Sequence, residues 1–155
     1  MKKIVLGAVA AVLVVVLLIG TPVWWKLDRI SYENELLNHF AAAIAADGVT
    51  AEYNGVVTRL NTSNTERLRP YLTRTERELK PFHTRENTGE SIMIRIDADV
   101  LVEVEQPDPG VDCVYIYYTN GSKHRTYSIE GYDTMRWMKQ VVSPEGMYGP
   151  NEEIA

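Results

Sequence analysis

The chain contains a single cysteine, Cys113, among its 155 residues. One cysteine excludes a disulfide bond within the chain, so the fold must be stabilised by packing alone. A lone thiol either pairs with a second chain or is an inert, half-buried side chain. The sequence also lacks an internal repeat and any motif typical of a phosphate-binding loop or a catalytic metal. We therefore predict no catalytic residue, no cofactor and no metal site.

An excess of positive charge is also missing. The chain has 16 basic and 21 acidic residues and a net charge of −5. Removing Lys2 and Lys3 leaves 14 basic residues against the same 21 acidic ones, so residues 26–155 are near −7. Nucleic acid and anionic lipid headgroups repel such a domain. The negative charge therefore excludes a nucleic-acid partner, and it excludes binding of the domain surface to anionic lipid headgroups.

The longest stretch without charge is also the most apolar. Residues 4–25 carry no charged side chain, and residues 4–20 consist of Val, Leu, Ile, Ala and Gly. At about 1.5 Å per residue, a helix over residues 4–25 is roughly 33 Å long, enough to cross the hydrocarbon core of a bilayer. Trp24, Trp25 and Lys26 follow, and such residues are typical of a membrane–water interface. The sequence therefore predicts a transmembrane anchor over residues 4–25, in contact with the lipid bilayer.

Two other interpretations of this stretch are a cleaved signal peptide and a buried core helix. The apolar run is long for a signal peptide, and residues 20–25 contain no pair of small residues that suits a cleavage site. Lys2 and Lys3 favour a short cytoplasmic tail, residues 1–3, although Lys26 and Arg29 weaken this bias. We therefore expect a single-pass signal-anchor protein of the cell membrane, with the C-terminal domain outside.

Residues 27–142 are predicted to form one extracytoplasmic α+β domain. A helix is expected over residues 27–47, a strand near 56–60 with a hairpin turn at 54–55 as an option, and a helix that begins at a capping box over 63–66. Pro70 should kink or restart that helix and Pro81 should end it. A last helix is expected over 133–142, and 143–155 should be a flexible tail. The apolar stripe of the first helix is predicted to be Leu27, Ile30, Leu37, Phe40 and Ile44, widened by Leu36 and Ala43.

The clearest pattern lies in residues 92–105, where apolar side chains occupy every second position. Strict alternation predicts one long strand with one face on the core. Strands over 111–119 and 123–129, joined by a turn at Asn120-Gly121, would complete a three-strand meander in a sheet of about four strands. The turns predict that Tyr117 lies opposite His124, Tyr115 opposite Thr126, Val100 opposite Ile116, and Val102 opposite Val114.

The other face of this meander holds the candidate site. This register brings Asp99, Tyr117 and His124 side by side on adjacent strands. Exposed tyrosines among a few polar groups are typical of a protein-contact surface. The alternatives are a solvated sheet face and a face covered by a helix. The predicted partner-binding residues are Asp97, Asp99, Leu101, Tyr115, Tyr117, His124 and Thr126.

A thiol hydrolase built from Cys113, His124 and Asp99 is opposed by geometry. Cys113 is expected opposite Ser128, four residues from His124, which corresponds to roughly 13 Å along a strand. A nucleophile and its base must lie about 3 Å apart. We therefore expect a membrane-anchored extracytoplasmic binding or accessory module with a protein partner. A subunit of a larger membrane assembly is one form that such a module can take. The alternative is a small envelope hydrolase whose catalytic residues the sequence does not identify.

Overall fold

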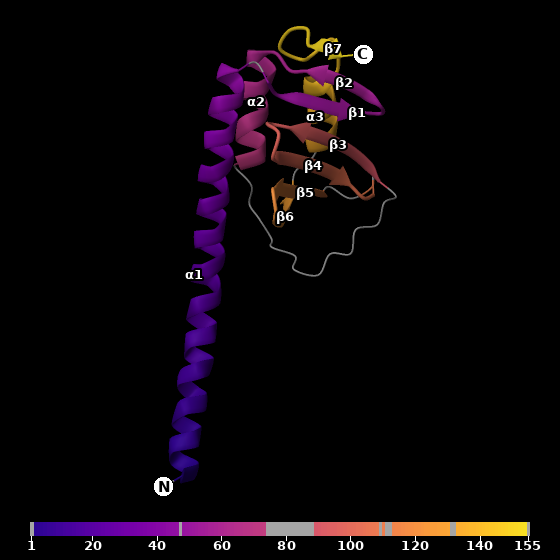
Figure 1. The fold of residues 1–155 in the computed structure, drawn as a ribbon. Coiled ribbons are helices and arrows are strands. Elements are labelled where there is room, and N and C mark those ends of the chain that lie inside the picture. The colour runs from indigo at the N-terminus through magenta and orange to yellow at the C-terminus, as the bar shows by residue number, and fades with distance from the viewer. Residues whose placement is uncertain are drawn as a thin grey trace. The chain divides into compact units, whose positions relative to one another are not determined.

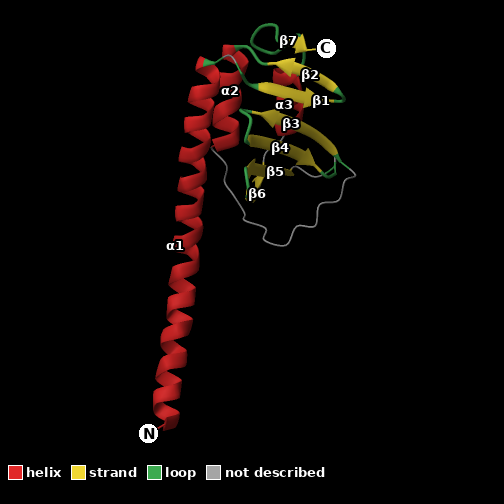
Figure 2. Ribbon diagram, in the orientation of Figure 1, coloured by secondary structure: helices red, strands yellow, loops and turns green. Residues whose placement is uncertain are grey.

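The computed structural model describes residues 2–46, 48–73, 89–108, 110, 113–130 and 133–154. It divides the chain into two compact units, Met1–Glu35 and Leu36–Ala155. The first unit belongs to helix α1 (Lys2–Ala45), and the second contains the last turns of that helix and a mixed helix–sheet domain. Figure 1 shows the order of the elements, and Figure 2 shows the division into helices and strands.

Helix α1 continues without a break through Pro22, although proline usually kinks or ends a helix. Proline removes one backbone hydrogen bond inside a helix, but such residues are tolerated in apolar helices when neighbouring groups compensate. The hydroxyl of Thr21 donates a hydrogen bond to the carbonyl of Leu17, one turn earlier in the helix. The polar side chain next to Pro22 is therefore satisfied within the helix itself.

The apolar side chains of residues 9–30 in α1 are exposed. Among the described residues, α1 is the one helix long and apolar enough to cross a membrane. Leu17, Leu18, Trp24 and Trp25 are each exposed, and the 18-residue window of highest hydropathy contains no buried residue. Water would solvate such a surface at a large free-energy cost, since exposed apolar area is unfavourable.

The second unit is built on one antiparallel sheet, which confirms the predicted α+β class. In the described residues the sheet has seven strands in the order β6-β5-β4-β3-β1-β2-β7, where the sequence predicted about four. The strands are β1 (Thr50–Tyr53), β2 (Val56–Arg59), β3 (Glu90–Arg95), β4 (Val100–Gln106), β5 (Cys113–Asn120), β6 (Lys123–Glu130) and β7 (Glu152–Ile154). The two other helices are α2 (Thr62–Thr73) and α3 (Thr134–Val142).

The prediction of one long strand over residues 92–105 is wrong. These residues form β3 and β4, a hairpin in which Ile94 lies opposite Val102. The N–H of Ile96 bonds to the carbonyl of Val100, so the loop contains three residues, 97–99. A loop with an odd number of residues places even-numbered positions of one strand opposite even-numbered positions of the other. Apolar alternation therefore passes through this turn unchanged, and a hairpin gives the same pattern as one strand.

The predicted registers of the other two hairpin pairs are also wrong, although the predicted faces are right. Tyr117 lies opposite Thr126 instead of His124, because the loop is Gly121-Ser122 and Asn120 still pairs with Lys123. Val102 lies opposite Tyr118 instead of Val114. The two pairings are displaced by two and four residues. Since side chains alternate with a period of two, even displacements leave each residue on its predicted face.

The inner face of the sheet forms the core. Its buried apolar residues are Ala51, Ile92, Ile94, Ile96, Val100, Val102, Val104, Val114, Ile116, Tyr118 and Tyr127. Helix α3 contacts β1 and β4 and contributes Met135, Met138, Val141 and Val142. It lies across one face of the sheet in Figure 1. The last turns of α1 bury Leu36, Phe40 and Ala43, whereas Leu37, at the centre of the predicted stripe, is exposed.

Helix α2 begins one residue before the predicted capping box over residues 63–66. Asn61 is its N-cap, because the side-chain oxygen of Asn61 accepts the N–H of Asn64 at 2.8 Å. The helix continues through Pro70 instead of restarting there. The predicted end of this helix at Pro81 lies outside the described residues. The predicted turn at Asn54-Gly55 is confirmed: both residues have positive φ, as a two-residue hairpin turn requires, and join β1 to β2.

Buried asparagines attach residues 143–154 to the rest of the domain, in the segment where the sequence predicted a flexible tail. The amide oxygen of Asn151 accepts the N–H of Asn61 and the side-chain N–H of Asn64. Its amide nitrogen donates to the carbonyls of Val141 and Ser143. Strand β7 then pairs with β2. A cluster of satisfied amides orders this segment, and the sequence pattern could not reveal it.

Candidate functional site

The structure divides the predicted partner-binding residues between two places. Asp97 and Asp99 lie in the turn between β3 and β4, not within a strand. The other five predicted residues lie on the outer face of the sheet: Leu101 on β4, Tyr115 and Tyr117 on β5, and His124 and Thr126 on β6. The predicted row of Asp99, Tyr117 and His124 is therefore wrong.

Neighbours on the outer face follow from the observed register. Tyr117 lies between Glu103 and Thr126. His124 lies opposite Thr119, whose hydroxyl is 3.2 Å from the Nδ1 atom of His124. The aromatic residues of this face are thus paired with carboxyl and hydroxyl groups instead of with the histidine.

The outer face is less exposed than a solvated sheet face. Glu103 and Glu105 are buried, at 8% and 3% relative exposure. Tyr115 and Tyr117 are half-buried, and His124 is exposed. Burial of a carboxylate is costly unless it is paired, so these glutamates are not ordinary surface residues. Glu103→Lys should therefore destabilise the domain, because it would bury an ammonium group on this face.

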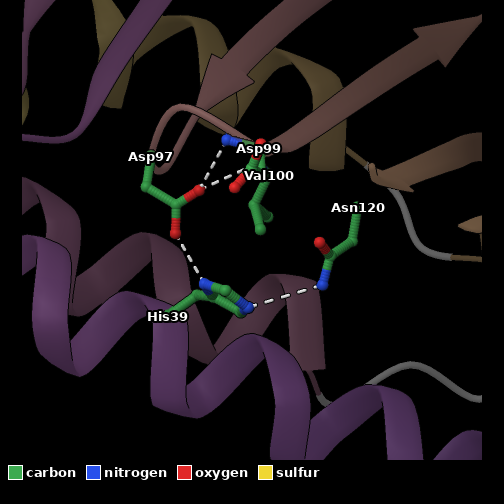
Figure 3. A network of polar contacts seen from close by, with 5 residues as sticks. All are labelled: His39, Asp97, Asp99, Val100 and Asn120. Carbon is green, nitrogen blue, oxygen red and sulfur yellow. Dashed lines mark hydrogen bonds and ion pairs between the residues drawn. The ribbon is translucent and has the colours of Figure 1, made fainter. Parts of the chain in front are cut away.

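A polar network that the sequence did not reveal lies at the end of the β3–β4 hairpin (Figure 3). The Nδ1 atom of His39, on α1, is 2.5 Å from Oδ2 of Asp97. The other carboxylate oxygen of Asp97 accepts the backbone N–H groups of Asp99 and Val100, each at 2.9 Å. The Nε2 atom of His39 is 3.5 Å from the side-chain nitrogen of Asn120, the last residue of β5.

The local sequence explains why Asp97 occupies this turn. Aspartate is depleted in strands and readily accepts hydrogen bonds from backbone N–H groups two and three residues later, which stabilises a tight turn. Burial raises the pKa of Asp97, but the hydrogen bonds from the N–H of Asp99, from His39 and from the N–H of Val100 outweigh burial and lower the pKa below its usual range. Asp97 is therefore held as a carboxylate.

This arrangement orients the imidazole of His39. A neutral ring that donates from Nδ1 to a carboxylate presents Nε2 as an acceptor, and the amide nitrogen of Asn120 lies on that side. A carboxylate-oriented histidine is also the base component of many hydrolases. Among the described contacts of His39 and Asp97 there is no hydroxyl or thiol nucleophile. The network connects α1 to the β3–β4 turn and to the end of β5.

A second polar cluster fixes α3 against the sheet. Lys139 forms an ion pair with Glu90 at the start of β3, and its ammonium lies 5.6 Å from the ring centroid of Tyr53. Burial lowers the pKa of Lys139, but its hydrogen bond to Glu90 and its interactions with Tyr53 raise the pKa above the ordinary value. The lysine is therefore protonated at neutral pH and acts as a structural cation.

Cys113 forms no disulfide bond and is half-buried at the start of β5. It lies opposite Glu130, not Ser128 as the predicted register required, which places it still farther along the strands from His124. The thiol-hydrolase arrangement is therefore not formed. Within the described part of the chain, no group of three or more His, Cys, Asp or Glu residues could hold a metal ion.

Sequence reasoning missed His39 and Asn120. His39 and Asp97 are 58 positions apart, and no periodicity relates a helix residue to a particular turn. One signal was present: the two aspartates at positions 97 and 99 stand between two segments rich in isoleucine and valine, which favours a turn. Comparisons of the chain with protein-family models, curated proteins and solved structures gave no match. Function is therefore inferred from the residues of this chain.

Proposed function

We propose that this protein is a membrane-anchored binding or accessory module. One observation carries the proposal: residues 4–25 of α1 are uncharged and apolar and long enough to span a bilayer, and from Val9 onwards these side chains are exposed. Trp24 and Trp25 are exposed at the end of this apolar stretch, followed by Lys26. Interfacial anchors of this kind fix the depth of a transmembrane helix.

The proposed orientation places the N-terminus in the cytoplasm and the residues from Leu36 onwards outside. Lys2 and Lys3 support this orientation, because basic residues are retained on the cytoplasmic side. The lone cysteine permits a direct test. In a Cys113→Ser background, single cysteines are introduced by Met147→Cys, at an exposed position, and by Lys3→Cys. Intact cells are then treated with a maleimide that does not cross membranes.

The Met147→Cys protein should be labelled in intact cells, and the Lys3→Cys protein only after permeabilisation. Labelling of both before permeabilisation would exclude a spanning helix, and the reverse pattern would invert the orientation. Extraction with alkaline carbonate should leave the protein in the membrane pellet. A Leu13→Glu, Leu17→Glu double change should release it, because a carboxylate at mid-bilayer costs about 2.5–3.5 kcal/mol each.

A binding role suits the surface chemistry of the second unit. Its predicted outer-face residues remain a candidate contact site, with Tyr115→Ala, Tyr117→Ala as the double change to examine. These tyrosines are half-buried, however, and more exposed tyrosines lie on α2 and after α3. Exposed aromatic and arginine side chains carry much of the energy of protein contacts.

The alternative function is a small envelope hydrolase, and the His39–Asp97 pair favours it. Such an enzyme would use His39 as the base, oriented by Asp97. Hydrolysis of a chromogenic ester by the purified full chain would then disappear in a His39→Asn variant and persist in a His124→Asn variant. Equal rates in all three proteins would exclude this alternative for that substrate class.

A further inference from the structure

Aromatic side chains from two helices stack on the surface of the second unit. The rings of Tyr71 on α2 and Trp137 on α3 are stacked, with centroids 3.7 Å apart and planes inclined by 22°. Tyr71 is nevertheless 42% exposed. Such a pair gives a large, rigid contact area that loses little conformational entropy on binding, since each ring already has a fixed orientation.

A second aromatic group lies one helical turn away. Arg67 precedes Tyr71 by four residues, so the two side chains share one face of α2. The guanidinium of Arg67 lies 5.2 Å from the ring centroid of Tyr148, a cation–π distance. Tyr148 and the neighbouring Met147 are both exposed. We call Arg67, Tyr71, Trp137, Met147 and Tyr148 the α2–α3 surface.

Buried contacts hold the loop part of this surface in place. The backbone N–H of Tyr148 donates to the side-chain oxygen of Asn64, which is fully buried. The side-chain nitrogen of Asn64 donates to the carbonyl of Gly149. A Cβ atom on Gly146 would lie 2.1 Å from the carbonyl oxygen of Gly149, so the loop fits closely. The exposed side chains are therefore carried by an ordered backbone, which reduces the entropy lost on binding.

The charge on this surface indicates the partner's chemistry. Among the described residues Arg67 forms no ion pair, and its contact with Tyr148 leaves guanidinium N–H groups available to a carboxylate. Arg136, the residue before Trp137, is exposed. One of its guanidinium nitrogens lies 3.8 Å from a carboxylate oxygen of Asp133. Arg67 thus provides positive charge beside the aromatic side chains in a protein whose overall charge is negative.

We infer that the α2–α3 surface binds an acidic, aliphatic segment of a protein partner. Aliphatic side chains of that segment lie over the Tyr71–Trp137 pair and Met147, and a carboxylate forms a charge-assisted contact with Arg67. This inference rests on the proposed binding role but not on the proposed anchor. Failure of the labelling experiment above would therefore leave the surface unaffected, and loss of the surface would leave the anchor unaffected.

The test uses the full chain in detergent and three fluorescent peptides of equal length. All three contain the same leucines and isoleucines, which are interspersed with glutamate, glutamine or lysine. Fluorescence anisotropy should show that the glutamate peptide binds at least tenfold more tightly than the glutamine peptide, a difference of about 1.4 kcal/mol. Arg67→Gln should remove that preference, and Trp137→Ala should weaken the binding of both the glutamate and the glutamine peptide.

Arg95→Gln is the charge-matched control, because Arg95 is an exposed arginine on β3. It should change binding less than twofold. Circular dichroism establishes that each variant is folded; should Trp137→Ala unfold, Met147→Ala replaces it. Equal binding of all three peptides, or equal losses in Arg67→Gln and Arg95→Gln, would overturn the inference. Self-association that Arg67→Gln abolishes would also overturn it, in favour of a second copy of this chain.

Discussion

The Nδ1 atom of His39 and the Oδ2 atom of Asp97 lie 2.5 Å apart, although 58 positions separate these residues in the sequence. His39 belongs to the last turns of α1, and Asp97 stabilises the turn that separates β3 from β4. One carboxylate therefore shapes a hairpin with one oxygen and binds a helix with the other. The loss of Asp97 should affect both.

Asp97→Asn should destabilise the folded domain by about 1–2 kcal/mol, since it weakens charge-assisted hydrogen bonds at a half-exposed site. Asp99→Asn is the matched control, because the Asp99 side chain is exposed and it is the backbone N–H of Asp99 that bonds Asp97. Thermal unfolding of the full chain in detergent, followed by circular dichroism, measures both. Equal melting temperatures would show that the network adds nothing to stability.

The same pair predicts a dependence of stability on acid pH. The pKa of Asp97 is lowered in the folded protein, so the native state binds fewer protons than the unfolded state as the group titrates. Its contribution is complete above the ordinary aspartate pKa of about 3.9 and is lost as pH falls through the folded value. The difference in melting temperature between wild type and Asp97→Asn should be constant from neutral pH to about pH 5 and should narrow below about pH 4. A difference that widens on acidification would contradict this sign.

Val102→Asp should cost several kcal/mol, enough to unfold a domain of ordinary stability, because Val102 is completely buried on the inner face of β4. Val56→Asp makes the same chemical change in β2, where the side chain is 38% exposed. That control should cost about 1 kcal/mol or less. Melting temperatures of the two variants give the comparison, and similar values would show that the face assignment is incorrect.

Asn151→Ala should destabilise the domain by about 2–4 kcal/mol, because it leaves buried N–H and carbonyl groups of several segments without partners. Asn38→Ala, at an exposed position of α1, is the matched control and should be neutral or slightly stabilising, since alanine has the higher helix propensity. Limited proteolysis should also cut residues 143–154 faster in the Asn151→Ala protein. A protease pattern identical to that of wild type would exclude a role for Asn151 in holding this segment.

Local sequence patterns were sufficient to predict some elements of the fold. The turn at Asn54-Gly55 was predictable because those two residues tolerate the positive φ that a tight hairpin requires. The inner-face residues of β3, β4 and β5 were predictable because alternation has a period of two regardless of register. The apolar helix of the first unit needed only composition and length.

Register and long-range contacts were not predictable from those patterns. The odd loop at residues 97–99 preserves alternation, so a fourteen-residue strand and a hairpin look alike in sequence. The length of the predicted strand argued against it, since strands rarely exceed about ten residues. The carboxylates of Glu103 and Glu105 followed the polar phase of the pattern and yet are buried. Burial depends on what packs against a face, and alternation carries no information on that.

The sequence by itself therefore determined the apolar helix, the α+β class and the division of strand residues between two faces. These properties follow from side-chain period and hydrophobicity, which are local. Tertiary structure decided the pairing of His39 with Asp97, the buried cluster around Asn64 and Asn151, and the stacking of Tyr71 on Trp137. Each of these contacts joins residues more than fifty positions apart, and their distances are fixed only when sheet and helices pack together.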